Sequence, residues 1–86
     1  MIEPEKVREL LLAGFPEGVV ELKDLTGTKD HYEAKVVSDL FAGKTLIAQH
    51  KLVYAALGDA MAGPIHALAL HTFTPEQWAK RPKRLS

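Results

Sequence analysis

The first pattern of apolar and polar residues along the chain predicts an amphipathic helix over residues 4–13. Val7, Leu10 and Leu11 recur at helical spacing, and the charged residues of this stretch fall mostly on the other faces. Gly14 follows directly, and a proline comes two residues later. Both residue types end helices, so we expect the first helix to end here.

Two stretches then alternate apolar and charged residues with the period of a half-exposed β-strand. In the first, Val20 and Leu22 alternate with glutamate and lysine, and in the second, Tyr32, Ala34 and Val36 do the same. The polar residues between them are typical of a turn. We therefore predict two strands joined as a hairpin.

A long helix capped by Thr45 is predicted to run to about residue 62, where a Gly-Pro pair ends it. Gly58 lies inside this helix, and we expect tertiary packing to override its low helix propensity. Leu52 falls off the predicted apolar stripe and is expected to be an exposed apolar contact. The stripe itself contains Leu46, Ile47, Val53, Tyr54, Leu57 and Met61.

The last two predicted elements are a short buried strand and a terminal helix. Residues 65–73 form an apolar run of strand length between a Gly-Pro and a Thr-Pro pair. Thr74 is a good N-cap, the proline after it suits the first helical position, and Gln77 completes a capping box. The helix carries Trp78, which is expected to complete the core together with Phe73.

The element order α-β-β-α-β-α predicts an α+β fold, with a three-stranded mixed sheet and helices on one face. This order resembles the class II KH-like topology. A KH domain clamps nucleotides with a Gly-x-x-Gly loop, but no two glycines here stand three positions apart. We expect one domain over residues 1–80, followed by a basic tail over residues 81–86.

Composition limits the chemistry that this chain can carry. It has 11 basic and 11 acidic residues, whereas a dedicated nucleic-acid binder usually has a basic excess. It has no cysteine, so any metal site must use histidine or oxygen ligands, or borrow sulfur from a partner. No apolar run is long enough to span a membrane, and no signal peptide precedes the first helix. We therefore expect a cytoplasmic protein.

Four histidines are the main candidates for chemistry, and no two of them have the i, i+4 spacing of a helical zinc motif. His66 and His71 differ by five positions, so they should point to opposite faces of one strand. His66 and His31 each lie where a strand begins and could meet at one edge of the fold. His50 is expected to be a boundary or core histidine with a hydrogen-bond partner, and His71 to face solvent or a partner.

No residue pattern indicates an enzyme. Neither serine, Ser38 or Ser86, lies in a nucleophile-elbow motif, and the chain has no thiol nucleophile.

Several motifs in the right order resemble the BolA family, over nearly the whole chain from the first helix to Trp78. These are Asp30-His31-Tyr32, Val36-Val37-Ser38, Phe41-Ala42-Gly43-Lys44, His50-Lys51-Leu52-Val53-Tyr54, Ile65-His66-Ala67-Leu68, and Thr72-Phe73-Thr74-Pro75-Glu76-Gln77-Trp78. The predicted fold agrees with the fold that this resemblance implies.

The resemblance implies a partner and a cofactor. BolA-like proteins pair with monothiol glutaredoxins and share a bridging [2Fe–2S] cluster, in cluster transfer or in iron and redox sensing. The family's C-terminal ligand histidine corresponds to His66, and His31 is the candidate for the second ligand. Two histidines can replace two thiolates on one iron of such a cluster. The partner would supply its cysteine and that of bound glutathione. Alone, the chain is expected to be a monomer or a weak homodimer.

A DNA-binding transcriptional regulator is the alternative that the resemblance also allows. Its contacts would come from the loop through Gly43 and Lys44, the long helix with Lys51, and the basic end of the chain, including Lys80 and Arg81. The neutral net charge argues against DNA binding as the main role.

Overall fold

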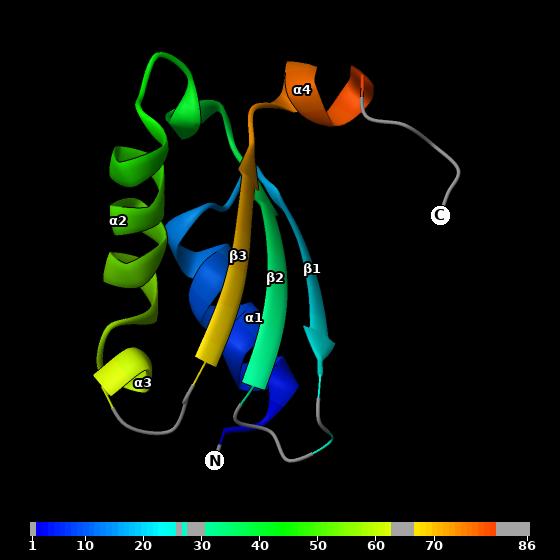
Figure 1. Ribbon diagram of the computed structural model, residues 1–86, viewed down its shortest axis with the longest axis vertical. Helices are drawn as coiled ribbons and strands as arrows, with labels where there is room; N and C mark the ends of the chain where they lie inside the picture. Colours follow the sequence, from blue (N-terminus) through cyan, green and yellow to red (C-terminus); the bar gives the residue numbers. More distant parts are fainter. Residues whose placement is uncertain (1, 26, 28–30, 63–66, 81–86) are drawn as a thin grey trace.

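The computed structural model describes residues 2–25, 27, 31–62 and 67–80 of the chain (Figure 1). It confirms the α+β class and the predicted element order, with one short helical turn and one short helix in addition. The elements are α1 (Pro4–Gly14), β1 (Val19–Asp24), β2 (His31–Val37), the 3₁₀ turn η1 (Asp39–Phe41), α2 (Leu46–Leu57), α3 (Asp59–Ala62), β3 (Ala67–Phe73) and α4 (Pro75–Lys80).

The three strands form one mixed sheet in the order β1-β2-β3. β1 and β2 are antiparallel neighbours, as the hairpin prediction requires, and Val19 pairs with Val37. β3 runs parallel to β2, with Ala67 opposite His31 and Phe73 opposite Val37. Both β2 and β3 therefore begin at one end of the sheet and finish at the other (Figure 1).

Alternating burial along β2 separates the two faces of the sheet. Tyr32, Ala34 and Val36 are fully buried, while the residues between them are half-exposed. Val20 of β1 is buried on the same face. The period-2 pattern in the sequence is thus the pattern of burial, because successive side chains of a strand point to opposite faces.

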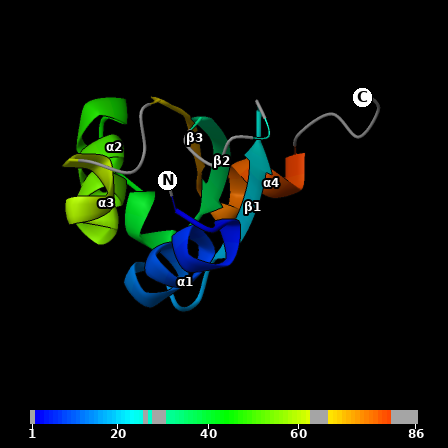
Figure 2. The same cartoon turned by 90° about the horizontal axis from the view of Figure 1, so that it is seen from below.

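Helices α1 and α2 cover the buried face. α1 packs against β1 and α2, and α2 packs against β3 (Figures 1 and 2). Gly14 allows α1 and α2 to approach closely, since a Cβ there would lie 2.7 Å from the Ala56 Cβ. The buried cluster between helices and sheet contains Val7, Leu11, Phe15, Val20, Tyr32, Ala34, Val36, Phe41, Val53, Leu57 and Ala60.

The prediction of one unbroken helix to residue 62 is wrong. α2 ends at Leu57, Gly58 takes a positive φ of 55°, and α3 is a separate short helix. The amide of Gly58 still donates to the Tyr54 carbonyl at 2.9 Å. A glycine adopts this backbone conformation without the Cβ clash that other residues meet, so Gly58 ends the helix instead of being overridden.

The predicted apolar stripe of α2 is also partly wrong. Val53 and Leu57 are buried as expected, but Leu46, Ile47 and Tyr54 are exposed. The buried face instead includes Gln49, and Leu52, which was expected to be exposed, packs against the core. The whole helix is rich in apolar residues, so its sequence defines no single stripe, and the position of the sheet decides which face is covered.

The capping box before α4 is confirmed. The Thr74 amide donates to Gln77 Oε1 at 2.9 Å, and the Gln77 amide donates to Thr74 Oγ1 at 3.2 Å. α4 lies beyond the end of β3, where the Trp78 and Phe73 rings meet with centroids 5.1 Å apart (Figure 1). Both rings are only half-buried. They lie at the end of the sheet and are not part of the central core, contrary to the prediction.

A buried serine joins the segments that follow α1 and β2. The Ser38 amide donates to the Phe73 carbonyl at 3.0 Å, and Ser38 Oγ accepts from the Leu40 amide at 3.0 Å. The same hydroxyl donates to Glu17 Oε1. This hydrogen bond, with smaller help from backbone amides, lowers the pKa of Glu17 below its ordinary value of 4.5.

We expect Glu17→Gln to lower the free energy of unfolding slightly at neutral pH and not at acidic pH. Because the folded-state pKa is lowered, the Glu17 carboxylate stabilises the fold above pH 4.5, and this contribution is lost as the pH falls through the folded value. Urea denaturation of wild type and variant between pH 7 and pH 3 measures the difference in their free energies of unfolding. A difference that stays constant over this range would contradict the stabilising role of the Glu17 carboxylate.

Candidate functional site

The end of the sheet where β2 and β3 begin carries His31, one of the two predicted cluster ligands. His31 is the first residue of β2 and is half-buried, and its carbonyl accepts from the Leu25 amide at 2.8 Å. Before His31 in the chain, Asp24 Oδ1 accepts a hydrogen bond from the Gly27 amide at 3.0 Å. Since His31 precedes the buried Tyr32, it lies on the face of the sheet opposite the helices.

Register places the start of β3 beside His31. Ala67 is its pairing partner in the parallel β2–β3 ladder. His66, the predicted main ligand, is bonded to Ala67 in the sequence but lies outside the described residues. The prediction was that His31 and His66 could meet at one edge of the fold. For this prediction the structure describes only His31 and the neighbour of His66, Ala67.

The side chains described around this end of the sheet do not by themselves form a metal site. No three His, Asp or Glu side chains of the described residues come close enough together to hold an ion. The chain has no cysteine, so it can offer a metal only histidine nitrogen or oxygen ligands. A partner would have to supply the thiolates.

His50 differs from its prediction. Its side chain is half-buried on α2, with its ring against Tyr54 at 6.4 Å between centroids. The Nε2 atom is buried and has no hydrogen-bond partner in the part of the chain that the structure describes. Among the described residues the expected partner is therefore missing, and His50 belongs to no group of three side chains that could hold a metal ion.

We expect His50→Met to raise the free energy of unfolding by about 1 kcal/mol. A buried polar atom without a hydrogen-bond partner is destabilising. Methionine fills a similar volume and has no nitrogen that needs such a partner. Chemical denaturation followed by circular dichroism measures the change. A loss of stability in the variant would mean that Nε2 is satisfied in solution.

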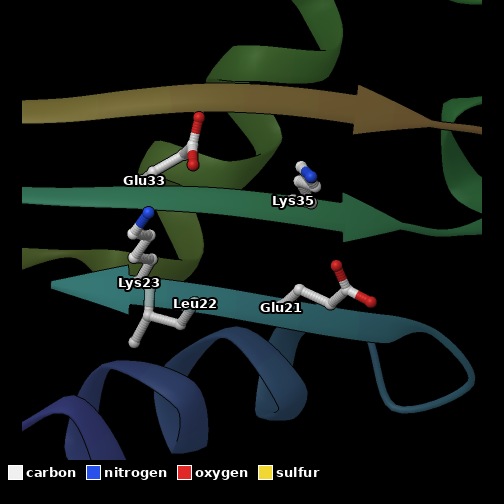
Figure 3. A pocket seen from close by; sticks show the side chains of 5 residues that line it. All are labelled: Glu21, Leu22, Lys23, Glu33 and Lys35. Carbon is white, nitrogen blue, oxygen red and sulfur yellow. The ribbon is translucent and has the colours of Figure 1, made fainter. Parts of the chain in front are cut away.

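The exposed face of the sheet carries balanced charge. Figure 3 shows Glu21 and Lys23 on β1, and Glu33 and Lys35 on β2, around a shallow hollow. His71 is exposed, as predicted, and its Nε2 lies 3.4 Å from Glu33 Oε2. Acidic and basic groups alternate here, so this face offers no cluster of like charges to a metal ion or to a phosphate.

The basic residues proposed for DNA contact are not gathered into one surface. Lys44 is exposed just before α2, and Lys51 is exposed on α2. Lys80 lies at the end of α4. α2 and α4 lie on different sides of the sheet end (Figure 1). The Lys80 ammonium also pairs with Glu76 Oε2 at 3.2 Å. Arg81 and the predicted tail lie outside the described residues.

Gln49 is a buried polar residue that the sequence reading missed. Its Nε2 donates to the Phe41 and Lys44 carbonyls, both at 3.1 Å. Its Oε1 accepts from Thr72 Oγ1 at 2.5 Å. This side chain therefore ties the loop before α2 to β3. A glutamine among apolar residues was the available signal, but its partners are far away in the sequence.

Comparison with known proteins identifies the family. The model of the family described as BolA-like protein matches residues 16–77. The chain is 32% identical to the DNA-binding transcriptional regulator BolA of Escherichia coli K12 over 85 residues, which cover 91% of this chain and 81% of that protein. It is 44% identical to the BolA-like protein 1 of Bos taurus over 57 residues, or 66% of this chain.

The bovine match spans only 42% of the bovine protein, so the chain covers less than half of that relative's length. Among solved structures, a BolA homologue from Coxiella burnetii is 34% identical, with a TM-score of 0.78 over 93% of this chain and 100% of that one. The names of these relatives describe BolA-like proteins and a DNA-binding regulator, and none describes a reaction. No helix in the described ranges is long and apolar enough to cross a membrane.

Proposed function

Because this chain belongs to the BolA-like family, we propose that it binds a [2Fe–2S] cluster jointly with a monothiol glutaredoxin. His66 would be the main ligand from this chain and His31 the second. The partner would supply its cysteine and that of bound glutathione. The observation that supports the proposal is the β2–β3 register, which sets the backbone of His31 opposite that of Ala67, the residue bonded to His66.

Imidazole ligands suit this role chemically. A [2Fe–2S] cluster accepts two histidines on one iron in place of two thiolates, and this change raises its reduction potential. Bound between two proteins, the cluster would supply iron and sulfide for transfer, or a redox-dependent signal. With no thiolate and no group of three candidate ligands in the described ranges, the chain would depend on its partner to hold the cluster.

The test is anaerobic cluster reconstitution with a monothiol glutaredoxin and glutathione, followed by visible circular dichroism. We expect a heterodimer spectrum that differs from that of the glutaredoxin alone. His66→Ala should abolish this spectrum and His31→Ala should weaken it, because each removes an imidazole ligand. Far-UV circular dichroism checks that each variant is folded.

His71→Ala is the matched control. It removes an exposed histidine from β3, and this histidine lies beside Glu33. We expect it to keep the heterodimer spectrum. An unchanged spectrum with His66→Ala, or equal loss with His71→Ala, would contradict the ligand assignment.

DNA binding is the second candidate function, and it is supported by the name of the Escherichia coli relative. Lys44 and Lys51 are exposed and would contact phosphates. If they do, Lys44→Ala combined with Lys51→Ala should weaken binding to duplex DNA and reduce the salt dependence by about one unit of slope for each lost contact. A failed heterodimer together with this salt-dependent loss would make DNA binding the better proposal.

A further inference from the structure

Exposed large apolar side chains are concentrated in one stretch of the chain, from η1 to α2. Of the large apolar residues that are exposed in the described ranges, most belong to η1 and α2: Leu40, Leu46, Ile47 and Tyr54. Leu46 is 62% exposed and Ile47 is 70% exposed. Ile47 and Tyr54 are separated by seven residues, so they share one face of the helix. Clustered apolar exposure of this kind marks interaction surfaces, whereas isolated exposed apolar residues are ordinary.

The same surface is basic, although the chain as a whole is neutral. Lys51 falls between Ile47 and Tyr54 at spacings of four and three, and Lys44 directly precedes the helix cap. Both lysines are exposed. No aspartate or glutamate occurs from residue 40 to residue 58. We call Lys44, Leu46, Ile47, Lys51 and Tyr54 the α2 patch.

Hydrogen bonds hold the α2 patch in place. Thr45 Oγ1 accepts from the Ala48 amide at 3.2 Å and so fixes the first turn of α2. Gln49 binds the Lys44 carbonyl from inside the fold and is anchored in turn by Thr72. A surface that is already ordered loses less conformational entropy on binding, so its apolar residues contribute more to affinity.

The start of α2, with Lys44, Leu46 and Ile47, lies at the other end of the sheet from His31. β2 leads from His31 at one end of the sheet to η1 and the start of α2 at the other (Figure 1). Its seven residues span about 20 Å. The first turn of α2 is therefore separated from His31 by the length of β2.

We propose that the α2 patch docks an amphipathic helix of a second protein, with an apolar face flanked by acidic residues. Leu46, Ile47 and Tyr54 would pack against that apolar face. Lys44 and Lys51 would pair with the acidic residues beside it, which sets orientation and rate of association. Duplex DNA is a poorer match, because leucine and isoleucine offer no hydrogen bonds to bases or phosphates.

The test uses the whole chain, labelled with ¹⁵N, and two synthetic helical peptides of stated chemistry. Both peptides carry leucines at i, i+3, i+4 and i+7. One has glutamates beside the leucines, and the other has lysines there. We expect the acidic peptide to shift the amide resonances of residues 44–54 saturably, and to bind at least about tenfold more tightly than the basic peptide.

Ile47→Ser should weaken binding of the acidic peptide by about tenfold or more. Leu25→Ser is the matched control, because Leu25 is 50% exposed but lies beyond β1, away from α2. Each side chain is largely exposed, so neither change should unfold the protein. The control should bind the acidic peptide as wild type does.

Three results would overturn the proposal: no saturable shifts with the acidic peptide, equal binding of both peptides, or unchanged binding of Ile47→Ser. Tighter binding of duplex DNA or of vesicles containing anionic phospholipid at these same amides would also overturn it. A ternary complex with glutaredoxin is a separate measurement. Loss of the cluster spectrum in the previous experiment therefore leaves the peptide result intact, and the two proposals fail independently.

Discussion

Gly18→Ala should destabilise this protein by about 3 kcal/mol or more, at the upper end of the range for overpacking. A Cβ at this position would lie 2.0 Å from the carbonyl oxygen of Val37, which is less than any real contact. The neighbouring residue, Val19, is paired with Val37 in the sheet, and the Gly18 amide donates to the Phe15 carbonyl. The backbone is thus held on both sides and has no simple way to move aside.

Gly27→Ala is the matched control for this prediction. Gly27 has a positive φ of 77°, but no atom lies within 4 Å of the place where a Cβ would be. Its replacement should cost only about 1 kcal/mol, from the strained backbone conformation. Urea denaturation compares the two variants. If Gly18→Ala costs no more than Gly27→Ala, the close approach to Val37 is not present in solution.

Gln49→Leu should lower the free energy of unfolding by about 2–3 kcal/mol. The change leaves the Lys44 carbonyl and the Thr72 hydroxyl without this partner, and the Phe41 carbonyl keeps only the Lys44 amide. Unpaired polar groups away from water are destabilising. The loop before α2 loses its tie to β3, so we also expect faster amide hydrogen exchange over residues 42–49. Denaturation and hydrogen exchange measure the two effects.

Gln77→Leu provides the comparison for Gln49→Leu. Gln77 also bonds a backbone group, the Thr74 amide, but it does so on the exposed surface. Its replacement should cost about 0.5–1 kcal/mol, as for other capping interactions. Thr72→Val in the Gln49→Leu background should add little, because both residues belong to one network. Equal losses for the two glutamine variants would argue against a buried network at Gln49.

The ligand choice of His31 and His66 stays a prediction. It depended on their places at strand starts and on the family resemblance, and the register of β2 and β3 gives only the backbone position of His31 opposite Ala67. Gln49 was not predictable, because its importance comes from Phe41, Lys44 and Thr72, which only the folded chain brings to it. The α2 patch was hidden for a similar reason, since Leu46 and Ile47 resemble core residues in the sequence.

The sequence by itself determined the elements whose signals are local. Alternation at Tyr32, Ala34 and Val36 defined the buried face of β2, and the Thr74–Gln77 capping box defined the start of α4. These features depend on residues a few positions apart, so local periodicity and hydrogen bonding are enough to specify them.

Tertiary structure alone decided the strand order, the parallel register and the exposed face of α2. The helix is apolar around much of its circumference, so burial depended on where α1 and the sheet could contact it, and the close approach at Gly14 is part of that contact. Gly58 ended α2 because its backbone could take a positive φ at the point where the chain turns back toward β3. Such outcomes depend on contacts between residues distant in sequence, which no local pattern contains.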